Sequence, residues 1–473
     1  MQKNDSDIVV NKSKNKPVKR VLTRWTSYWS FLLAAIGSSV GLGNLWKFPY
    51  EMGSHGGGTF LLIYIPSLIL LAVPLMKAEL LIGRYGGSNP VHGLRQIAQQ
   101  ERLSSLWQIV GWMGMIAGFL VFSYYSVVAS WILFYIMQSA TGSFVDVPAE
   151  IVQHSFTALL RNTDQLIIWH TVFVLMVVLI LSRSVKVGLE RALLILMPCF
   201  IALLVWLCVF ASQFGDFEKA VEFVFTYDIG AINAELIVSA VAQALFSLSV
   251  GLGILLMYGA YLGEHRPITT AAGVVMFFDT AIALLMALLI FSIVFAFGMK
   301  TDSGPGLIFE TLPVAFSQMQ SNPALWATLF FTLLGVAALA SAIALLEPCI
   351  AWMVDQFRVS RRFAAWFIGG LAWGAGFVSI YSFNSLKYSF YYFGVERFNG
   401  TFDFLNILTT HILMPLTALF ITIFAGWRIS QSRARSELAN PLNLVFSIWV
   451  LCVRYVAPLI LLVMLAIVFV YPS

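Results

Sequence analysis

Charged residues are scarce in this chain of 473 residues: Asp, Glu, Lys and Arg make up 11% of it, whereas hydrophobic residues make up 59%. Because soluble proteins carry about 25% charged residues, this composition excludes an ordinary water-soluble fold. Cysteine is also rare, and the four cysteines fall inside apolar segments without the spacing of a metal site or a disulfide framework. The six histidines are scattered, and no nucleophile–base set or phosphate-binding loop occurs, so we expect no enzyme.

The sequence contains many long hydrophobic segments. About 20 apolar residues are enough to cross the hydrocarbon core of a membrane as a helix, and the sequence predicts an all-α polytopic membrane protein with eleven such spans. They lie near residues 26–50, 57–82, 105–138, 166–183, 188–212, 233–262, 267–299, 324–356, 361–382, 401–427 and 445–471. The first 24 residues are polar and basic and no small-residue cleavage site follows, so we expect no cleavable signal peptide.

Lys and Arg are distributed unequally between the loops. Most of them fall in the amino-terminal tail and in alternate loops, such as residues 183–191 and 358–362. Because cytoplasmic loops carry the excess of positive charge, we predict a multi-pass membrane protein with a cytoplasmic amino terminus. An odd number of spans then places the carboxyl terminus outside. The net charge of +5 is spread over these short loops and does not indicate a nucleic-acid partner.

Two spans carry glycine and serine where a helix is expected to continue. Residues 37–44 read Gly-Ser-Ser-Val-Gly-Leu-Gly-Asn, and residues 247–253 read Ser-Leu-Ser-Val-Gly-Leu-Gly. Each glycine weakens a helix interior by roughly 1 kcal/mol, and irregular backbone is tolerated in a membrane only where it lines a protein cavity. Interrupted spans in corresponding halves of a chain indicate inverted repeats around a transport site. The alternative is that these glycines are close contacts between packed helices.

These motifs resemble those of the neurotransmitter:sodium symporter family, in its bacterial amino-acid branch, which includes leucine and tryptophan transporters. The most specific stretch is Gly37–Pro49, and the resemblance runs from about Trp25 to the last span. Further matching stretches are residues 56–60, 83–87, 124–131, 243–261 and 337–348. The resemblance implies a 5+5 inverted repeat with helices 1 and 6 broken.

That architecture divides the chain into six segments. We expect a cytoplasmic tail at 1–25, a first repeat at 26–212, an extracellular loop at 213–232, a second repeat at 233–427, a cytoplasmic loop at 428–444, and the eleventh span with an extracellular end at 445–473.

An amino-acid substrate brings a carboxylate and an ammonium group into a low dielectric, where both need partners. Helix amino termini favour anions, so we expect the amides of Leu42 and Gly43 to bind the carboxylate, and the resemblance adds the hydroxyl of Tyr125. The ammonium group is expected to be held by backbone carbonyls near the side chain of Ser249. These carbonyls belong to Ser39, Phe246 and Ser247.

The expected pocket for the substrate side chain contains no charged residue. Its members are Val121, Tyr125, Phe246, Ser249, Leu252, Ala338, Ser341, Ala342 and Leu345, with Ser38 near the base. Because a charged side chain would be costly to bury there, we predict a small neutral, apolar amino acid. Leu252, where relatives often have phenylalanine, and the small Ala342 leave room for a bulkier side chain.

The resemblance implies a first sodium site at Ser39, Asn44, Ser247 and Asp279, completed by the substrate carboxylate. An acidic residue in the middle of a span, such as Asp279, is expensive and usually functional. Many animal relatives have asparagine there and recruit chloride, and this chain has Ala283 where those relatives have serine. We therefore expect Asp279 to supply the negative charge and transport to be independent of chloride. A protonated aspartate hydrogen-bonded to a neighbouring helix is the alternative.

A second sodium site would use the carbonyls of Gly37, Val40 and Ala337 with the hydroxyl of Ser341. The family normally places threonine or aspartate one residue before that serine, and this chain has Ala340 instead. Water replacing the oxygen, weak sodium binding, an empty site and another cation all stay open. The expected cofactor is therefore one or two sodium ions.

The gates also depart from the family pattern. The outer arginine–aspartate pair is replaced by Lys47 and Asn406, with Asp403 three residues earlier, so we expect a looser gate or one rewired to Asp403. At the inner gate, Asp355 is expected to pair with Arg24 or Arg20. A solvated run of amino-terminal charges is the alternative for these arginines.

The resulting hypothesis is a sodium-coupled symporter that imports a small neutral amino acid by alternating access. Two alternatives remain: the same fold driven partly by protons, with Asp279 or Glu347 titrating, and an amino-acid sensor that transports little. The expected partners are the substrate and the lipid bilayer, and the sequence indicates no obligatory protein partner.

Overall fold

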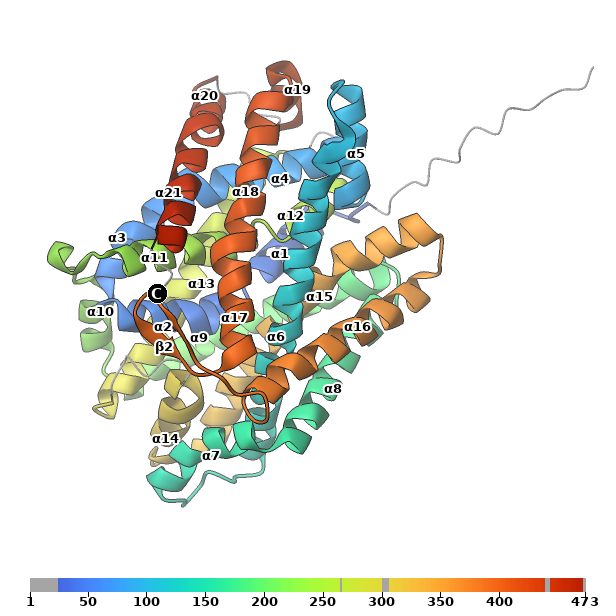
Figure 1. The fold of residues 1–473 in the computed structure, drawn as a ribbon. Coiled ribbons are helices and arrows are strands. Elements are labelled where there is room, and N and C mark those ends of the chain that lie inside the picture. Colours follow the sequence, from blue (N-terminus) through green and yellow to red (C-terminus); the bar gives the residue numbers. More distant parts are fainter. Residues whose placement is uncertain (1–23, 264–265, 300–305, 439–442, 471–473) are drawn as a thin grey trace, which may run out of the picture.

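The computed structural model describes residues 24–263, 266–299, 306–438 and 443–470, and this part of the chain is almost entirely helical (Figure 1). Nine continuous helices in these ranges are long and apolar enough to cross a membrane. In chain order they are Gly58–Gly86, Ser105–Ala140, Thr163–Leu181 (α8), Lys186–Phe214, Ile268–Ala296 (α13), Pro323–Phe357 (α15), Arg361–Ser382 (α16), Gly400–Arg428 and Asn443–Val470.

Several of these long helices contain short π or 3₁₀ turns that divide them. Their parts are α3 (Gly58–Ser67), η2 (Leu68–Ala72), α4 (Val73–Gly86), η3 (Ser105–Trp107), α6 (Gln108–Ala140), η4 (Lys186–Glu190), α9 (Arg191–Phe214), α17 (Gly400–Ile407), η7 (Leu408–Leu413), α18 (Met414–Ile423), η8 (Phe424–Arg428), α20 (Asn443–Leu451), η9 (Cys452–Val456) and α21 (Ala457–Val470).

Two further spans are interrupted, at the places that the glycine and serine motifs predict. In the first span, α1 (Tyr28–Ser39) is followed by η1 (Gly43–Lys47) and α2 (Phe48–Ser54), and the two halves are bent by 49°. In the sixth span, α11 (Ala234–Ser247) and α12 (Ile254–Ala260) flank six irregular residues. Together with the nine continuous helices these make eleven spans, so the fold prediction is confirmed.

Local backbone chemistry fixes where the first span begins and where the sixth span is interrupted. The first helix starts at a capping box in which Ser27 and Ser30 bond each other's backbone amides. In the sixth span, Ser249, Gly251 and Gly253 have φ of +55°, +81° and +75°. This left-handed region ends a helix and costs free energy for a residue with a Cβ, such as Ser249. The strain is concentrated where the span faces the interior of the bundle.

Close packing fixes the broken segment of the sixth span against α6. A Cβ on Gly118 would come within 2.9 Å of the carbonyl oxygen of Leu252, and a Cβ on Gly114 would come within 3.0 Å of the amide of Gly253. These two glycines of α6, one turn apart, therefore let the irregular backbone lie directly on the helix. Helix α15 also packs along α6, and so closes the space around the two breaks.

Short elements cover the two ends of the bundle. At one end, which we call the α5–α19 face, lie α5 (Pro90–Gln100) and α19 (Gln431–Leu438); at the other, the α7–α14 face, lie α7 (Ala149–Arg161) and α14 (Leu312–Ser317) (Figure 1). The remaining short elements are α10 (Phe217–Phe225), η5 (Ile229–Ala231), η6 (Leu307–Thr311) and the strands β1 (Phe390–Tyr392) and β2 (Val395–Arg397). The antiparallel β1–β2 hairpin is an addition to the all-helical prediction.

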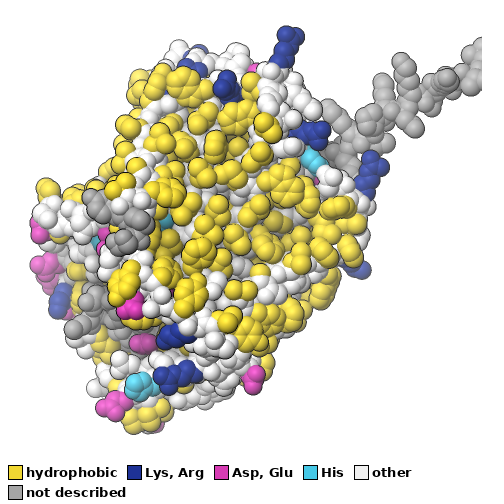
Figure 2. Space-filling model, viewed as in Figure 1, with side chains coloured by type: hydrophobic (Ala, Val, Ile, Leu, Met, Phe, Trp, Pro, Cys, Tyr) yellow, Lys and Arg dark blue, Asp and Glu magenta, His cyan; other side chains and the backbone are white. Residues whose placement is uncertain are grey.

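The side of the bundle is strongly apolar. Figure 2 shows hydrophobic side chains across the middle of the visible face, with Lys and Arg at its upper and right edges and both acidic and basic side chains toward its lower end. Large apolar side chains of α9 and α16 are about half exposed, among them Trp206, Val209 and Trp366. An apolar surface of this extent fits the hydrocarbon layer of a membrane, and the chain is a multi-pass membrane protein.

Candidate functional site

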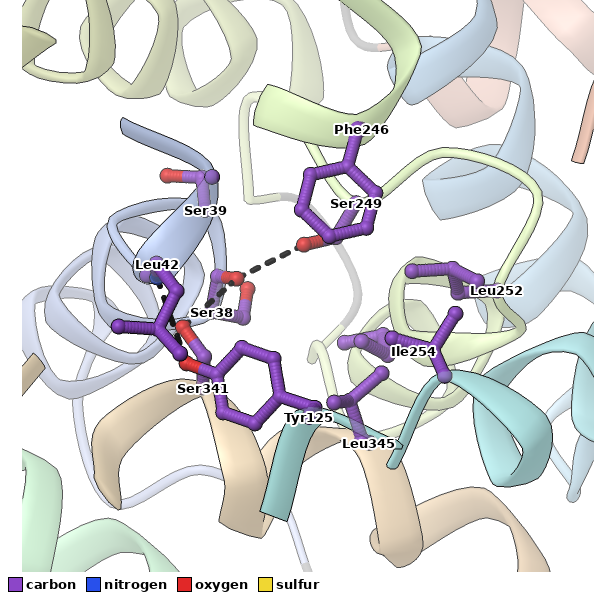
Figure 3. A pocket seen from close by; sticks show the side chains of 13 residues that line it. Ser38, Ser39, Leu42, Tyr125, Phe246, Ser249, Leu252, Ile254, Ser341 and Leu345 are labelled. Carbon is purple, nitrogen blue, oxygen red and sulfur yellow. Dashed lines mark hydrogen bonds between the residues drawn. The ribbon is translucent and has the colours of Figure 1, made fainter. Parts of the chain in front are cut away.

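A small pocket lies between the two interrupted spans, and α6 and α15 complete its wall (Figure 3). Its lining residues are Ser38, Ser39, Gly41, Leu42, Gly43, Val121, Tyr125, Phe246, Ser249, Leu252, Ile254, Ser341 and Leu345. Hydroxyl groups and the broken backbone of the first span gather on one side, whereas Leu252, Ile254 and Leu345 gather on the other. The pocket is therefore polar at one end and apolar at the other, and its lining carries no charged side chain.

The pocket brings together most of the residues predicted to bind substrate. Of the fourteen residues predicted for the substrate site, eleven line it. Ser247 lies outside the lining, in the buried cluster around Asp279, and Ala338 and Ala342 of α15 are not among the lining residues. Gly41 and Ile254 line the pocket as well and were missed. Both adjoin the glycine motifs, Gly41 within the first and Ile254 directly after the second, so the motifs were a signal for them.

Hydroxyl groups satisfy the backbone carbonyls that the first break leaves without helical partners. Ser341 Oγ donates to the carbonyls of Gly37 and Ser38, at 3.2 and 3.4 Å. Ser249 Oγ donates to the Ser38 carbonyl at 2.7 Å, so the two broken spans are bonded directly to each other. Unmatched carbonyls at a helix end are costly when buried, and these hydroxyls stabilise the break.

Tyr125 connects the pocket to the start of the second half-helix. The Leu42 amide donates to the Tyr125 hydroxyl at 3.4 Å, and that hydroxyl donates to the Ala338 carbonyl at 3.3 Å. The phenol is thus held beside the amide end of η1, where the helix dipole favours negative charge. This arrangement is suited to a carboxylate, because an anion placed there would accept from both groups.

A second polar cluster lies behind the pocket and is completely buried. Asn44 Nδ2 donates to Asp279 Oδ1 at 2.7 Å. Ser247 Oγ is hydrogen-bonded to Asp279 Oδ2 and lies 3.0 Å from Asn44 Oδ1. Tyr64 donates to Ser247 at 3.2 Å, and Gln243 Nε2 donates to the Gly43 carbonyl at 2.8 Å. The cluster joins the first, second, sixth and seventh spans.

The donor set of this cluster is suited to a hard monovalent cation. Carboxylate, amide and hydroxyl oxygens converge from Asp279, Asn44 and Ser247, and hard cations prefer oxygen ligands. Within the described ranges, no group of three or more His, Cys, Asp and Glu side chains could hold a metal ion. A single carboxylate with neutral oxygens balances one positive charge, as sodium requires.

The residues predicted for a second sodium site also lie together. Ser341 is bonded to the Gly37 carbonyl, and Val40 and Ala337 are fully buried nearby in the same break and on α15. Ala340 is fully buried as well and offers only a methyl group. The second sodium site stays a prediction, with one side-chain oxygen fewer than the family pattern places there.

Of the two alternatives for the outer gate, the described residues show no contact between Lys47 and Asp403, and a looser gate stays a prediction. Lys47 Nζ lies 5.2 Å from the ring centre of Phe246, and among the described residues this buried nitrogen has no hydrogen-bond partner. Asp403 instead accepts from the Asn399 amide at 3.0 Å, which caps the start of α17. Asn406 contributes its backbone carbonyl to Thr409 and Thr410. The local cap holds Asp403 away from Lys47, and the ammonium group packs on an aromatic ring.

At the predicted inner gate, Asp355 has a partner at the start of α5. Asp355 accepts from Asn89 Nδ2 at 2.8 Å, and Arg24 is exposed. Arg20 lies outside the described residues. A pairing of Asp355 with Arg24 stays a prediction.

The start of α1 is fastened by contacts that sequence reasoning missed. The Trp25 amide donates to the Tyr261 carbonyl and its indole to the Tyr258 carbonyl, at 3.1 and 3.2 Å. The Thr26 amide donates to Glu190 at 3.0 Å. Below them, Tyr261 donates to Glu347 at 2.7 Å. The only signal in the sequence was an acidic residue, Glu347, inside an apolar span.

Glu347 is neutralised within the bundle. Arg361 bonds both of its carboxylate oxygens in a bidentate pair, and Arg361 Nε also donates to the Leu181 carbonyl at 3.0 Å. A bidentate pair of this kind is among the stronger contacts between side chains. The pair joins α15 to the start of α16.

Two broken spans around a small pocket, with a buried oxygen cluster beside it, are typical of one class of protein, the secondary transporters. The comparisons with known proteins place the chain within that class. The model of the sodium:neurotransmitter symporter family matches residues 23–157 and 151–473. The chain therefore belongs to the sodium:neurotransmitter symporter family, whose members are sodium-dependent transporters and not enzymes.

Individual relatives agree over almost the full length. The chain is 32% identical to an uncharacterized sodium-dependent transporter of Bacillus subtilis, YhdH, over 95% of this chain and 97% of the relative. It is 29% identical to a sodium-dependent transporter of Haemophilus influenzae, over 93% and 96% of the two chains. Among solved structures, MhsT in complex with L-phenylalanine matches with a TM-score of 0.86 and 35% identity, over 94% of this chain and all of that one.

Proposed function

We propose that this protein is a chloride-independent sodium symporter that imports a neutral, apolar amino acid by alternating access. The observation that carries the proposal is the polarity of the pocket between the two broken spans. Its polar end holds the Leu42 amide and the Tyr125 hydroxyl, and its other end is formed by Leu252, Ile254 and Leu345. An amino acid has the same division between its charged backbone groups and its side chain.

The substrate is oriented by these two ends. Its carboxylate binds at the Leu42 and Gly43 amides and at Tyr125, and its ammonium group faces the carbonyls of Ser39 and Phe246. The apolar wall accepts the side chain, and a charged side chain is excluded because nothing in the pocket would neutralise it. The complex of the related MhsT with L-phenylalanine supports a bulky apolar substrate for this chain.

The ions couple to the substrate through the first broken span. One sodium ion binds among Asn44, Ser247 and Asp279, with the Ser39 carbonyl and the substrate carboxylate as further ligands. Because substrate and ion share that carboxylate, each raises the affinity of the other by the same factor. The charge of Asp279 makes chloride unnecessary. A second sodium ion binds more weakly at Gly37, Val40, Ala337 and Ser341.

The α5–α19 face is the cytoplasmic side of a bacterial inner membrane in this proposal. Arginine is concentrated there, as the excess of positive charge in cytoplasmic loops requires. The arginines that we assign to this face are Arg84, Arg95, Arg183, Arg358, Arg362, Arg428, Arg433 and Arg435. The amino terminus is then cytoplasmic, the carboxyl terminus is outside, and substrate enters from the α7–α14 face.

A binding screen tests the proposed substrate class. The purified protein is equilibrated with each of the standard amino acids, and the rise in unfolding temperature is measured in sodium chloride, in sodium gluconate and in potassium chloride. We expect the largest rises with neutral apolar amino acids, in both sodium salts and not in potassium. Strongest binding of Asp, Glu, Lys or Arg would contradict the substrate class, and equal binding in potassium would contradict sodium coupling.

The sodium stoichiometry is tested at Ala340. We expect Ala340→Thr to restore the missing side-chain oxygen of the second site and to lower the sodium concentration for half-maximal uptake. The sodium Hill coefficient is expected to rise toward roughly two, the ceiling for two coupled sites. Ala340→Val, of nearly the same size as threonine, is the matched control without an oxygen. If the wild-type Hill coefficient for sodium is already near that ceiling and Ala340→Thr leaves it unchanged, Ala340 does not weaken sodium binding at the second site.

A further inference from the structure

The β1–β2 hairpin contacts the tenth span and both interrupted spans. It joins α16 to α17, and its two-residue turn places Phe393 at φ +53° and Gly394 at φ +71°. Positive φ at both turn positions is typical of a type I′ hairpin, and a phenylalanine there is strained. A hairpin with strands of three residues is marginal on its own, so its shape depends on the contacts that it makes.

One of these contacts is with the tenth span. The Tyr392 hydroxyl lies 2.6 Å from His411 Nδ1, and their rings are 5.5 Å apart. Tyr392 is buried, whereas its neighbour Tyr391 points away and is 61% exposed. Burial raises the pKa of the Tyr392 phenol, so the hydroxyl stays protonated over the physiological range. The hairpin is thus bonded to η7 through one defined side chain.

The other contacts are with the outer halves of both broken spans. Arg397 lies 3.8 Å from Glu235, at the start of α11, and close to the Tyr50 hydroxyl of α2. The opposite ends of these same elements line the pocket, through Gly43 of η1 and Phe246 of α11. The hairpin therefore connects the far ends of two half-helices to a third helix.

Side chains of the first and tenth spans link the hairpin to the wall of the pocket. His411, the partner of Tyr392, lies near both Arg397 of the hairpin and Lys47 of the first span. Lys47 in turn lies over the Phe246 ring, which is part of the pocket wall. If α2 and α11 are to move away from the tenth span, the contacts of Arg397 and Tyr392 must break first.

From this geometry we infer that the β1–β2 hairpin is a lid, with Tyr392 and Arg397 as the positioning residues that latch it over the pocket. The inference rests on the proposed function, because a lid acts on a bound substrate. Release toward the α7–α14 face requires the latch to open. The pair of Tyr392 with His411 and the pair of Arg397 with Glu235 thus set how long the substrate stays bound.

Dissociation kinetics test the lid. The purified full-length protein is loaded with tritiated L-phenylalanine in sodium, excess unlabelled L-phenylalanine is added, and the release of label is followed. We expect Tyr392→Phe and Arg397→Gln each to release the label about three- to tenfold faster, the factor that corresponds to the loss of one hydrogen bond or charged contact. Tyr391→Phe, one residue away on the exposed side of β1, is the matched control and is expected to leave the rate unchanged.

Two further measurements separate a latch from a general loss of stability. Glu235→Gln is expected to act like Arg397→Gln, and the double variant is expected to release no faster than either single one, because the two residues form one contact. The unfolding temperature without substrate is expected to stay within the range of the Tyr391→Phe control. A release rate in Tyr392→Phe and Arg397→Gln equal to that of Tyr391→Phe would overturn the lid while leaving the transporter proposal intact. Failure of the wild type to bind any neutral amino acid would overturn the proposed function, and the lid with it.

Discussion

Asp279→Asn is expected to lower sodium-driven uptake in chloride-free medium by roughly two to three orders of magnitude, because a buried cation loses its counter-charge, at a cost of about 3–5 kcal/mol. The substitution keeps the size of the side chain, and its oxygen can still accept from Asn44 or Ser247, which bond the carboxylate now. What it removes is the negative charge in a completely buried cluster. Initial uptake rates in sodium gluconate measure the effect.

Chloride provides the matching rescue experiment. We expect added chloride to restore part of the uptake of Asp279→Asn, and to restore more when Ala283→Ser supplies a hydroxyl nearby. The wild type is expected to be indifferent to chloride. Asp164→Asn, at the exposed start of α8, controls for the loss of one negative charge. Full uptake by Asp279→Asn without chloride would show that the carboxylate does not serve as the counter-charge.

Gly41→Ala is expected to abolish measurable uptake by separating the first broken span from α15. A Cβ at this position would collide with Ser341 Oγ, and it would lie 2.9 Å from Ser341 Cβ and 3.2 Å from the Tyr125 hydroxyl. Forcing one methyl group into a packed site costs about 1–3 kcal/mol. Here the displaced groups also hold the Gly37 and Ser38 carbonyls and the amide of Leu42. Equilibrium binding and uptake together measure the loss.

The control for this substitution is another glycine in a membrane span. Gly273 lies in α13, and no atom lies within 4 Å of the position that its Cβ would take. Gly273→Ala is therefore expected to leave uptake unchanged and to stabilise the helix by up to about 1 kcal/mol. Uptake by Gly41→Ala equal to that of Gly273→Ala would mean that the first break does not need to touch Ser341, contrary to the geometry of the site.

Much of the fold could be predicted because membrane spans depend on local composition. Each apolar run is long enough on its own to identify a helix, and the clustered glycines of residues 37–43 and 249–253 marked the breaks without any tertiary information. The β1–β2 hairpin could not be predicted in this way. Its turn contains a phenylalanine at positive φ, and its strands are held by His411 and Glu235, which are distant in the sequence.

The part of the candidate site that lies on the two glycine motifs could be predicted from the sequence. The pocket lies on the two glycine motifs, and the neighbours of Asp279 lie on or beside them. Contacts of a side chain that has several possible partners were not predictable, because the sequence does not show which partner it will bind. Asp403 is engaged by the amide of Asn399 at its own helix start, so Lys47 packs on Phe246 instead. The pairing of Arg361 with Glu347 is of the same kind, because it requires the end of α15 to meet α16.

The most direct test of the whole account is uptake into proteoliposomes. The protein is reconstituted, labelled neutral amino acids are added outside, and an inward sodium gradient is imposed with chloride or gluconate as the anion. The account predicts accumulation above the external concentration that requires sodium and is equal in both anions. Accumulation driven by a proton gradient without sodium, or binding of amino acid with no accumulation at all, would contradict it.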